Sequence, residues 1–489
     1  MRENNSRHSF DFCYVISNGF SARMLFQTGL IPTLANRCNG IALIVPDKND
    51  ENLIKYTKDN NNISIFEIQL PNSFWTDDYK FKRKYYLENI KTNPALYEKH
   101  IHSIRYNKSL HPWRRIRAFY YILIHLLIPY FPSIKKQFIK NESKYLINNE
   151  VIKLISNISP KIVIATYPVN ILEAQVLFAA KKNNIKTLIH LLSWDNITSK
   201  GRFPVEGDEY ISWGPIMTNE LIEYYQTPKT HIHECGVPHF DIHLGIKDKA
   251  TPENLLGELN LDQNKPYIVA AMSAPRFSPH EIDIVEWIAQ KIEKGELGKN
   301  MQLVIRPHPQ NITGNMSDNK WLKRLKKLSS DKVAIDYPIL TRSSIQWSMK
   351  NNDMIRLSHL LGSSLVCINC GSTISIDSML VGRPVIIASF DGYFRLPFWK
   401  SAKRLIQFTH LKKFIALNGV RVVNNYDELK NNILELNKNP NIDDNKIKNA
   451  LLQICNNPNG NATELVLEVK INILSKIFNK NNTGALSEK

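Results

Sequence analysis

Short hydrophobic runs alternate with longer amphipathic stretches in the first half of the chain. A helical pattern covers 172–183, and the apolar runs around it are FCYVIS, IALIVP, ISIFEI, KIVIATYP and IKTLIHLL. Short runs that are apolar throughout are typical of strands buried on both faces of a parallel sheet. Strands alternating with helices predict an α/β domain.

The alternation starts again at residue 267. The second set of apolar runs is YIVAAMS, QLVIRP, VAIDY, SLVCIN and PVIIAS, separated by helical patterns at 280–294, 320–328 and 373–381. The segment 245–267, just before the second set, is polar and carries two prolines, which suits a domain boundary. We therefore expect two Rossmann-like domains that face a central cleft. Their predicted extents are a first domain over 1–245, a linker over 246–264, a second domain over 265–438 and a helical tail over 439–489 that packs on the second domain.

Region 68–150 departs from this alternation, because it is aromatic, basic and helical in pattern. We interpret it as an insertion in the first domain. Within it, 111–137 places mostly apolar residues between flanking Arg and Lys, but His125, Pro129 and Pro132 interrupt a run that is too short to span a bilayer. The flanking charges and aromatic side chains suit a helix lying in an anionic membrane interface. A helix buried between the domains fits the same pattern.

The composition adds a strong positive charge to this picture. The 489 residues include 63 Lys and Arg against 45 Asp and Glu, which gives a formal net charge of +18. An anionic partner is expected, such as a nucleotide, an anionic glycan or a membrane surface. Nucleic acid is not expected, because the basic residues are spread over many segments and no zinc-finger spacing or RNA-binding aromatic signature accompanies them.

Cysteine usage and the N-terminal sequence bear on the compartment. The six cysteines are sparse for the length, and several lie in apolar runs, which favours a reducing compartment. Cys367 and Cys370 form a lone C-x-x-C, so we interpret them as packing residues rather than metal or redox ligands. The opening MRENNSRHSFDFCYVIS lacks a signal-peptide core. We therefore expect a cytoplasmic protein.

Three loops of the second domain follow buried strands and carry polar residues. CGSTISID presents Gly371, Ser372 and Thr373 at the start of a helix, where backbone N–H groups and the helix dipole favour phosphate. A turn that binds nothing fits the same residues. After the strand QLVIR, Arg306 and His308 sit in a turn stiffened by prolines and suit a diphosphate or a leaving-group oxygen, unless this is only a surface turn. With Ser273 in SAPRFSPHE, these loops are expected to line one rim.

The first domain offers a polar loop of its own. LLSWDNITSKGRF packs Trp194, Asp195, Asn196 and Lys200 together after a strand. Asp195 is a candidate general base for a substrate hydroxyl. The alternative makes Asp195 an Asx-turn residue and Trp194 a wedge against the domain interface.

The loop SNGFSARMLFQTG, after the first strand, adds Asn18 and Arg23 facing the same cleft. Arg23 is a candidate for binding an acidic acceptor, or only a helix-surface carboxylate.

These motifs together resemble a known enzyme group. SWDNITSKGRF, DEYISWGPIMTNEL, CGVPHFD, LVIRPHP, CGSTISIDSMLVGRPVII and FTHL look like bacterial surface-polysaccharide glycosyltransferases of the two-Rossmann GT-B architecture. The pattern is related to that of non-hydrolysing UDP-N-acetylglucosamine 2-epimerases and CDP-glycerol glycerophosphotransferases. The resemblance covers about 185–425, and the first 180 residues share only the topology.

The resemblance implies a nucleotide-activated donor held by the second domain and an acceptor held by the first. By motif, the loop 371–373 would hold the donor diphosphate, with Arg306 and His308 beside it. Such families often have Glu in GSTxxxE contacting the ribose, and Asp377 stands at that position here. His410 in FTHL matches a loop that approaches the donor, although a helix cap or core histidine fits it too. The chain has no Asp-x-Asp, as expected for catalysis without a metal-bound donor.

We therefore expect a peripheral enzyme of the inner membrane face that moves a sugar, or a polyol phosphate, from a nucleotide to a surface-glycan or lipid-linked acceptor. Direct displacement is expected, with Asp195 as base and no cofactor or metal. A sugar-nucleotide 2-epimerase and a non-catalytic glycan-binding protein are the alternatives.

Overall fold

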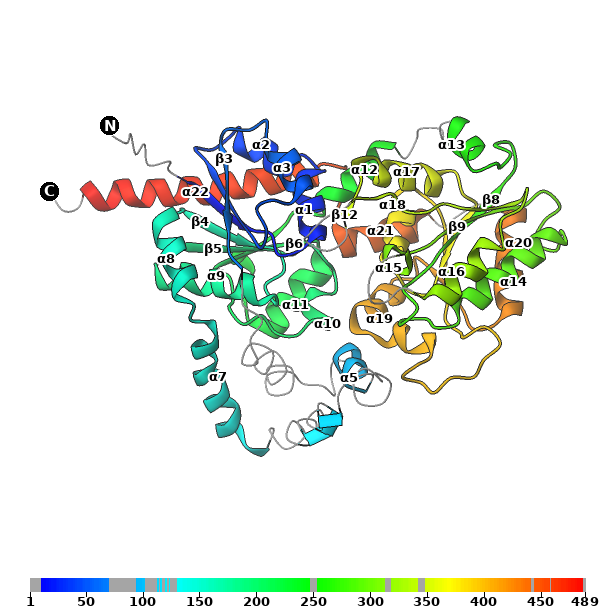
Figure 1. The fold of residues 1–489 in the computed structure, drawn as a ribbon, viewed down its shortest axis with the longest axis horizontal. Helices are drawn as coiled ribbons and strands as arrows, with labels where there is room; N and C mark the ends of the chain where they lie inside the picture. The colour runs from blue at the N-terminus through cyan, green and yellow to red at the C-terminus, as the bar shows by residue number, and fades with distance from the viewer. Residues whose placement is uncertain are drawn as a thin grey trace.

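The computed structural model describes residues 10–69, 94–101, 112–113, 115–116, 119–120, 123, 130–246, 253–312, 318–341, 348–440, 444–457 and 459–486. Figure 1 shows two α/β lobes side by side, each built on its own sheet. The predicted fold class is confirmed.

The first domain is a parallel sheet of seven strands in the order β3-β2-β1-β4-β5-β6-β7. The strands are β1 (Phe12–Val15), β2 (Ile41–Val45), β3 (Ile63–Glu67), β4 (Ile162–Ala165), β5 (Lys186–His190), β6 (Glu209–Ser212) and β7 (Ile232–Glu234). Its helices include α1 (Gly19–Phe26), α2 (Leu30–Ala35), α3 (Glu51–Thr57), α8 (Asn149–Ile158), α9 (Ile171–Lys182), α10 (Asn196–Ser199) and α11 (Pro215–Tyr225). The strand order reverses between β1 and β4, so a crevice is expected outside their carboxyl ends.

The second domain is a parallel sheet of six strands in the order β10-β9-β8-β13-β14-β15. The strands are β8 (Tyr267–Ala271), β9 (Gln302–Arg306), β10 (Val333–Ile335), β13 (Val366–Asn369), β14 (Val385–Ala388) and β15 (Arg421–Val423). Its helices include α14 (Glu281–Glu293), α15 (Pro309–Ile312), α16 (Asn319–Lys326), α17 (Asn351–Gly362), α18 (Ile374–Leu380), α19 (Thr409–Ala416) and α20 (Tyr426–Lys438). The order reverses between β8 and β13, and the loops after these two strands carry Ser273 and Gly371.

The ends of the chain tie the domains together. The helix α12 (Asp241–Ile246) ends where the predicted linker begins, and α13 (Glu253–Glu258) lies within the linker, whereas 247–252 lie outside the described residues. After α20, α21 (Asp444–Cys455) contacts α11 of one domain and α18 of the other. The last helix, α22 (Ala462–Leu486), then returns to the first domain, where Asp241 of α12 caps it by accepting from the Ala462 and Thr463 N–H groups at 3.0 and 2.8 Å.

This return corrects the expectation that the tail packs on the second domain. Figure 1 shows α22 lying along the first domain, and Arg37 near its first turn pairs with Glu464 at 2.6 Å. Val466 and Leu467, on the apolar face of α22, are buried. An amphipathic pattern predicts a buried face but does not say which domain covers it, which is why the sequence misassigned this helix.

The insertion is described only in part. It contains α5 (Pro94–Ile101) and α7 (Pro132–Leu146), and most of 68–130 lies outside the described residues. Where side chains of 111–137 are described, large apolar ones face solvent: Trp113 is 72% exposed and Tyr130 is 78% exposed. These side chains do not fit a helix buried between the domains. Among the described residues, no helix has the length and apolarity to cross a bilayer.

Candidate active site

A cavity of about 480 Å³ lies between the two domains. Its walls come from the loops after β5, β8, β9 and β13, from the start of α19 and from α5 of the insertion. The predicted site residues that line it are Trp194, Asp195, Lys200, Ser273, His308, Gly371, Ser372, Thr373 and His410. Predicted site residues as far apart in the sequence as Trp194 and His410 thus line one cavity, because parallel strands end at the same edge of each sheet (Figure 1).

Two smaller hollows share residues with this cavity. One, of about 380 Å³, is lined mainly by the first domain and combines Asp195 and Lys200 with Asn18 and Asn196. The other, of about 180 Å³, is lined by His308 and Thr373 and also by Arg306 and Asp377. The side chain of Arg23 lies outside the described part of the structure.

The loop after β13 uses part of its own hydrogen-bonding capacity. Gly371 adopts φ +100°, a conformation that favours glycine. The N–H groups of Gly371 and Ser372 both donate to the Asn369 side-chain oxygen, at 2.8 and 2.9 Å. These two groups are therefore not directed at a ligand, in contrast to the expectation of an open phosphate cradle. The Ser372 and Thr373 side chains still line the cavity.

Asp195 and Lys200 form an ion pair at the junction of the two larger hollows. Lys200 Nζ lies 2.9 Å from Asp195, whose carboxylate also accepts from the Ser193 and Ser199 hydroxyls at 2.6 Å each. Burial by itself would raise the pKa of Asp195, but Lys200, His410 and the two hydroxyls hold it well below its usual value. The carboxylate does not cap α10, so the Asx-turn alternative is not what the structure shows.

Trp194 packs across the domain interface. Its ring lies 5.0 Å from the His410 ring and 5.5 Å from the Phe414 ring, both on α19. His410 Nδ1 also lies 3.4 Å from the Thr198 hydroxyl, so His410 contacts the first domain as well as the cavity. Trp194 therefore acts as the expected wedge while it also lines the cavity.

His308 has a defined tautomer. Its Nδ1 accepts from the Gln310 backbone N–H at 3.1 Å, so the ring proton sits on Nε2. Burial lowers the pKa of His308 to about 4, which keeps the ring neutral at pH 7. A neutral imidazole in this tautomer donates a hydrogen bond from Nε2.

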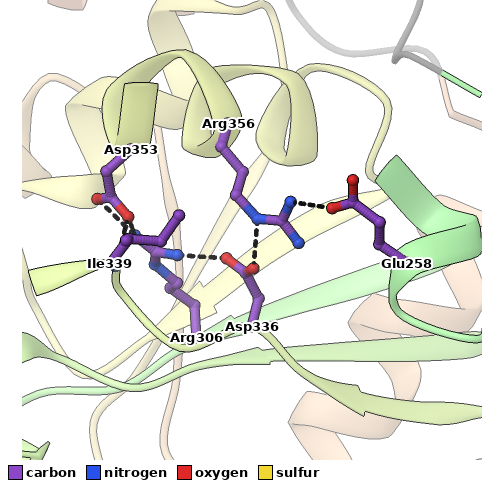
Figure 2. Close-up of polar contacts among 6 residues, drawn as sticks. All are labelled: Glu258, Arg306, Asp336, Ile339, Asp353 and Arg356. Atoms are coloured by element: carbon purple, nitrogen blue, oxygen red, sulfur yellow. Dashed lines mark hydrogen bonds and ion pairs between the residues drawn. The ribbon is translucent and has the colours of Figure 1, made fainter. Parts of the chain in front are cut away.

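Arg306 occupies a buried ion-pair network instead of the cavity wall. Figure 2 shows its guanidinium between Asp336 and Asp353, with Nη2 at 2.8 and 2.7 Å from the two Asp353 oxygens. Arg356 binds the far side of Asp336 at 2.7 Å. This differs from the predicted diphosphate contact, because protein carboxylates already hold the guanidinium nitrogens. Arg306 instead fixes the end of β9, from which the His308 turn emerges.

Asp377 likewise has a protein partner. His243 of α12 lies 2.6 Å from it and is fully buried, and the other ring nitrogen of His243 lies 2.5 Å from the Ser358 hydroxyl of α17. One carboxylate oxygen of Asp377 is therefore bonded to His243 of α12 rather than left for a ribose, although Asp377 lines the hollow of about 180 Å³.

No protein-family model matches the chain, and no curated protein matches it. Solved structures do resemble it over nearly its whole length. A UDP-N-acetylglucosamine 2-epimerase from Listeria monocytogenes, described as putative, has 11% identity and a TM-score of 0.56, with 94% of this chain and 95% of that chain covered. The UDP-GlcNAc 2-epimerase from Neisseria meningitidis, solved with UDP-GlcNAc, has 11% identity and a TM-score of 0.53 over 94% and 99% of the two chains. The S. aureus MnaA structure with UDP has 10% identity and a TM-score of 0.50 over 93% and 94%.

The chain has the GT-B fold. Two parallel Rossmann-like sheets, facing each other across a cleft lined by strand-end loops, define this architecture here. Identities this low show a shared fold and not a shared reaction.

The sequence did not single out several residues of the GT-B cleft. Glu98 and Arg276 line the main cavity. Buried glutamates brace the loops on both sides: Glu173 accepts from the Thr166 and Tyr167 N–H groups at 2.8 and 2.6 Å, and Glu281 accepts from the Ser273 N–H at 2.7 Å. Burial raises the pKa of Glu173 and of Glu281 to about 7 in spite of these bonds. Each glutamate lies in the first turn of a helix that follows a strand, which was the available signal.

The cysteines take no part in the cleft lining. Cys367 and Cys370 are buried and unpaired, and burial raises the pKa of Cys367 to about 12. Both positions fit the packing role predicted for them.

Proposed function

We propose that the protein is a glycosyltransferase that moves a sugar from a nucleotide donor to a surface-glycan or lipid-linked acceptor. The observation that carries this proposal is the cavity of about 480 Å³, which has second-domain strand ends on one wall and the Trp194–Lys200 loop on the other. A donor on the second domain and an acceptor on the first would meet there. The neighbouring folds that hold UDP or UDP-GlcNAc favour a uridine nucleotide as the first donor to test.

The proposed reaction is a direct displacement without a metal. The acceptor oxygen forms a bond to the anomeric carbon, the bond from that carbon to the nucleotide phosphate breaks, and the acceptor proton passes to Asp195. Lys200 and the two serine hydroxyls keep Asp195 ionised and occupy its carboxylate oxygens, so the acceptor hydroxyl must replace one of the serine hydroxyls before transfer. His308 Nε2–H and Lys200 then stabilise the departing phosphate, while Asn18 and Asn196 face the acceptor.

The test is thermal and chemical unfolding of the full chain with UDP, CDP, CMP, GDP and their sugar or glycerol conjugates. A ligand at 100 times its Kd that binds only the folded state raises the free energy of unfolding by about 2.7 kcal/mol. We expect one nucleotide family to do so, with the effect reduced in Ser372→Ala/Thr373→Val and retained in Ser330→Ala, whose hydroxyl lies outside the three hollows. If no nucleotide shifts unfolding, a nucleotide donor is wrong and a glycan-binding protein is favoured.

A sugar-nucleotide 2-epimerase is the second candidate. It would need first-domain carboxylates at the sugar, and Asp195 lies there with Glu173 behind the Ser17 hydroxyl at 2.5 Å. Epimerised UDP-sugar formed without any acceptor would decide for it, whereas transfer only in the presence of acceptor would exclude it.

The membrane part of the proposal predicts binding to anionic lipid. Trp113 and Tyr130 are more than two thirds exposed, on an insertion rich in Lys and Arg. We expect the full chain to sediment with phosphatidylglycerol vesicles but not with phosphatidylcholine ones, and less so at high salt. Trp113→Ser/Tyr130→Ser is expected to weaken binding by on the order of tenfold. Tyr393→Ser, at a 69% exposed aromatic of the second domain, is the matched control, and equal losses in both variants would refute insertion-mediated docking.

A further inference from the structure

Two positively charged side chains line the main cavity, and each is paired with a carboxylate of the protein. Lys200 pairs with Asp195 at 2.9 Å, and Arg276, in the loop after β8, pairs with Glu98 at 3.0 Å. The positive charges of Lys200 and Arg276 repel each other across the cavity. Two cations held close together in a partly buried site favour an anion between them.

The two carboxylates differ in how they are held. Asp195 belongs to the same loop as Lys200 and is fixed by two serine hydroxyls. Glu98 lies on α5, a helix of eight residues in the insertion, and its side chain is only 1% exposed. The helix α5 and the start of α19 both line the main cavity, and α5 also contacts α10 of the first domain. Glu98 therefore reaches into the second domain from a separate element of the first.

Arg404 has several hydrogen-bond acceptors besides Glu98, whereas Arg276 has no other among the described residues. The buried Arg404 guanidinium lies 3.4 Å from Glu98 but also donates to the carbonyls of Arg276, Phe277, Lys400 and Ser401. These bonds hold the β8 loop in place whatever Glu98 does. Within the described residues, Glu98 is the one hydrogen-bond acceptor of Arg276, whose side chain is 23% exposed at the cavity.

We propose that Arg276 is an anion-binding residue of this cleft, and that Glu98 occupies the place of a ligand phosphate until the ligand displaces it. The proposal rests on the proposed function only in taking the phosphate from a nucleotide donor. A diphosphate beside Glu98 would put like charges together in a poorly solvated site, so Glu98 must leave when the diphosphate arrives. Because α5 also contacts α10, and the Tyr97 ring packs at a tilt against the Trp399 ring with centroids 4.8 Å apart, its release loosens the wall next to Asp195.

The first experiment measures pyrophosphate binding to the full chain by calorimetry at low salt. Glu98→Gln keeps the size of the side chain and removes its charge, so we expect it to bind pyrophosphate about tenfold more tightly than the unaltered protein. Arg276→Gln is expected to lose most of the binding, and the double variant to behave like Arg276→Gln. Tyr97→Ala weakens the docking of α5 without touching a charge, and we expect a smaller gain. The pyrophosphate affinity of Tyr97→Ala also tests the proposal if Glu98→Gln folds poorly.

Glu220→Gln is the matched control. Glu220 is a buried glutamate that pairs with Lys413 at 2.8 Å and does not line the main cavity. Its neutralisation changes the net charge as Glu98→Gln does, so unchanged pyrophosphate affinity is expected. A gain in Glu220→Gln equal to that in Glu98→Gln, or a Glu98→Gln gain that persists with Arg276→Gln, would overturn the proposal.

Hydrogen exchange of 94–101 tests the displacement itself. Pyrophosphate should speed exchange in this segment of the unaltered protein, and Glu98→Gln should exchange fast without it. Slower exchange on binding would mean that α5 closes over the ligand, which contradicts displacement.

Repeating the titration with UDP separates this proposal from the proposed function. Equal UDP affinity for the unaltered protein and Glu98→Gln would overturn the role of Glu98 and leave nucleotide binding intact. Pyrophosphate binding that depends on Glu98 and Arg276, with no UDP binding, would support the anion site and contradict a uridine nucleotide donor. No binding of either probe to any variant would overturn the anion site.

Discussion

Asp353→Ala is expected to lower the free energy of unfolding by about 3–5 kcal/mol. Asp353 has no exposed surface, and its loss would leave the buried Arg306 guanidinium with Asp336 alone, which Arg356 already shares (Figure 2). The Ile339 N–H, which donates to Asp353 at 2.9 Å, would lose its acceptor as well. Urea unfolding followed by circular dichroism measures the change.

The other end of the same network supplies the control. Glu258 pairs with Arg356 at 2.7 Å, but its side chain is 54% exposed. Exposed ion pairs contribute about 0–1 kcal/mol, so Glu258→Ala should be nearly neutral. Similar losses for Asp353→Ala and Glu258→Ala would show that burial does not set the energetics here. Because the network fixes the end of β9, we also expect Asp353→Ala to weaken nucleotide binding at the neighbouring His308 turn.

The fold was predictable because most of its strands are short runs of apolar residues, which the sequence shows directly. All ten runs named from the apolar pattern form strands of the two parallel sheets. Three further strands of these two sheets, β6, β7 and β15, were not recognised. They read EYIS, IHE and RVV, and they are short, mixed in polarity or only partly buried, so their place in the sheet depends on neighbours that a local pattern does not report.

The location of the cleft was also predictable from the strands, but which side chains form ion pairs there was not. Parallel strand ends converge by topology, which brings His308, Gly371 and Asp195 to one cavity. Whether an arginine there faces a ligand depends on distant residues. Arg306 is bonded to carboxylates 30 and 47 positions later, whereas Arg276, which the sequence did not distinguish, faces the cavity.

Lys470→Met is expected to stabilise the protein by about 2–4 kcal/mol near pH 7. Lys470 lies on α22 with no exposed surface, and its Nζ has no hydrogen-bond partner among the described residues. It sits over the Tyr14 ring at 5.1 Å, close enough to His190 to lower the pKa of that ring further. Burial lowers the pKa of Lys470 to about 7, and Cys235 acts in the opposite direction. A methionine of similar length would fill the same space without the charge.

The gain from Lys470→Met should depend on pH with a definite sign. The pKa of lysine in the unfolded chain is about 10.4, so between pH 7 and pH 10.4 the unfolded state binds more protons at this site than the folded state does. Lys470 therefore lowers the free energy of unfolding most at or below pH 7, and this destabilisation shrinks as the pH approaches 10. Urea midpoints at pH 7 and pH 9.5 should show a gain that shrinks at the higher pH. Lys476→Met, at an exposed lysine on the same helix, should stay within about 0.5 kcal/mol at both pH values. A gain independent of pH would mean that Lys470 is not neutralised by burial, and a loss would mean that its ammonium group is stabilised where it lies.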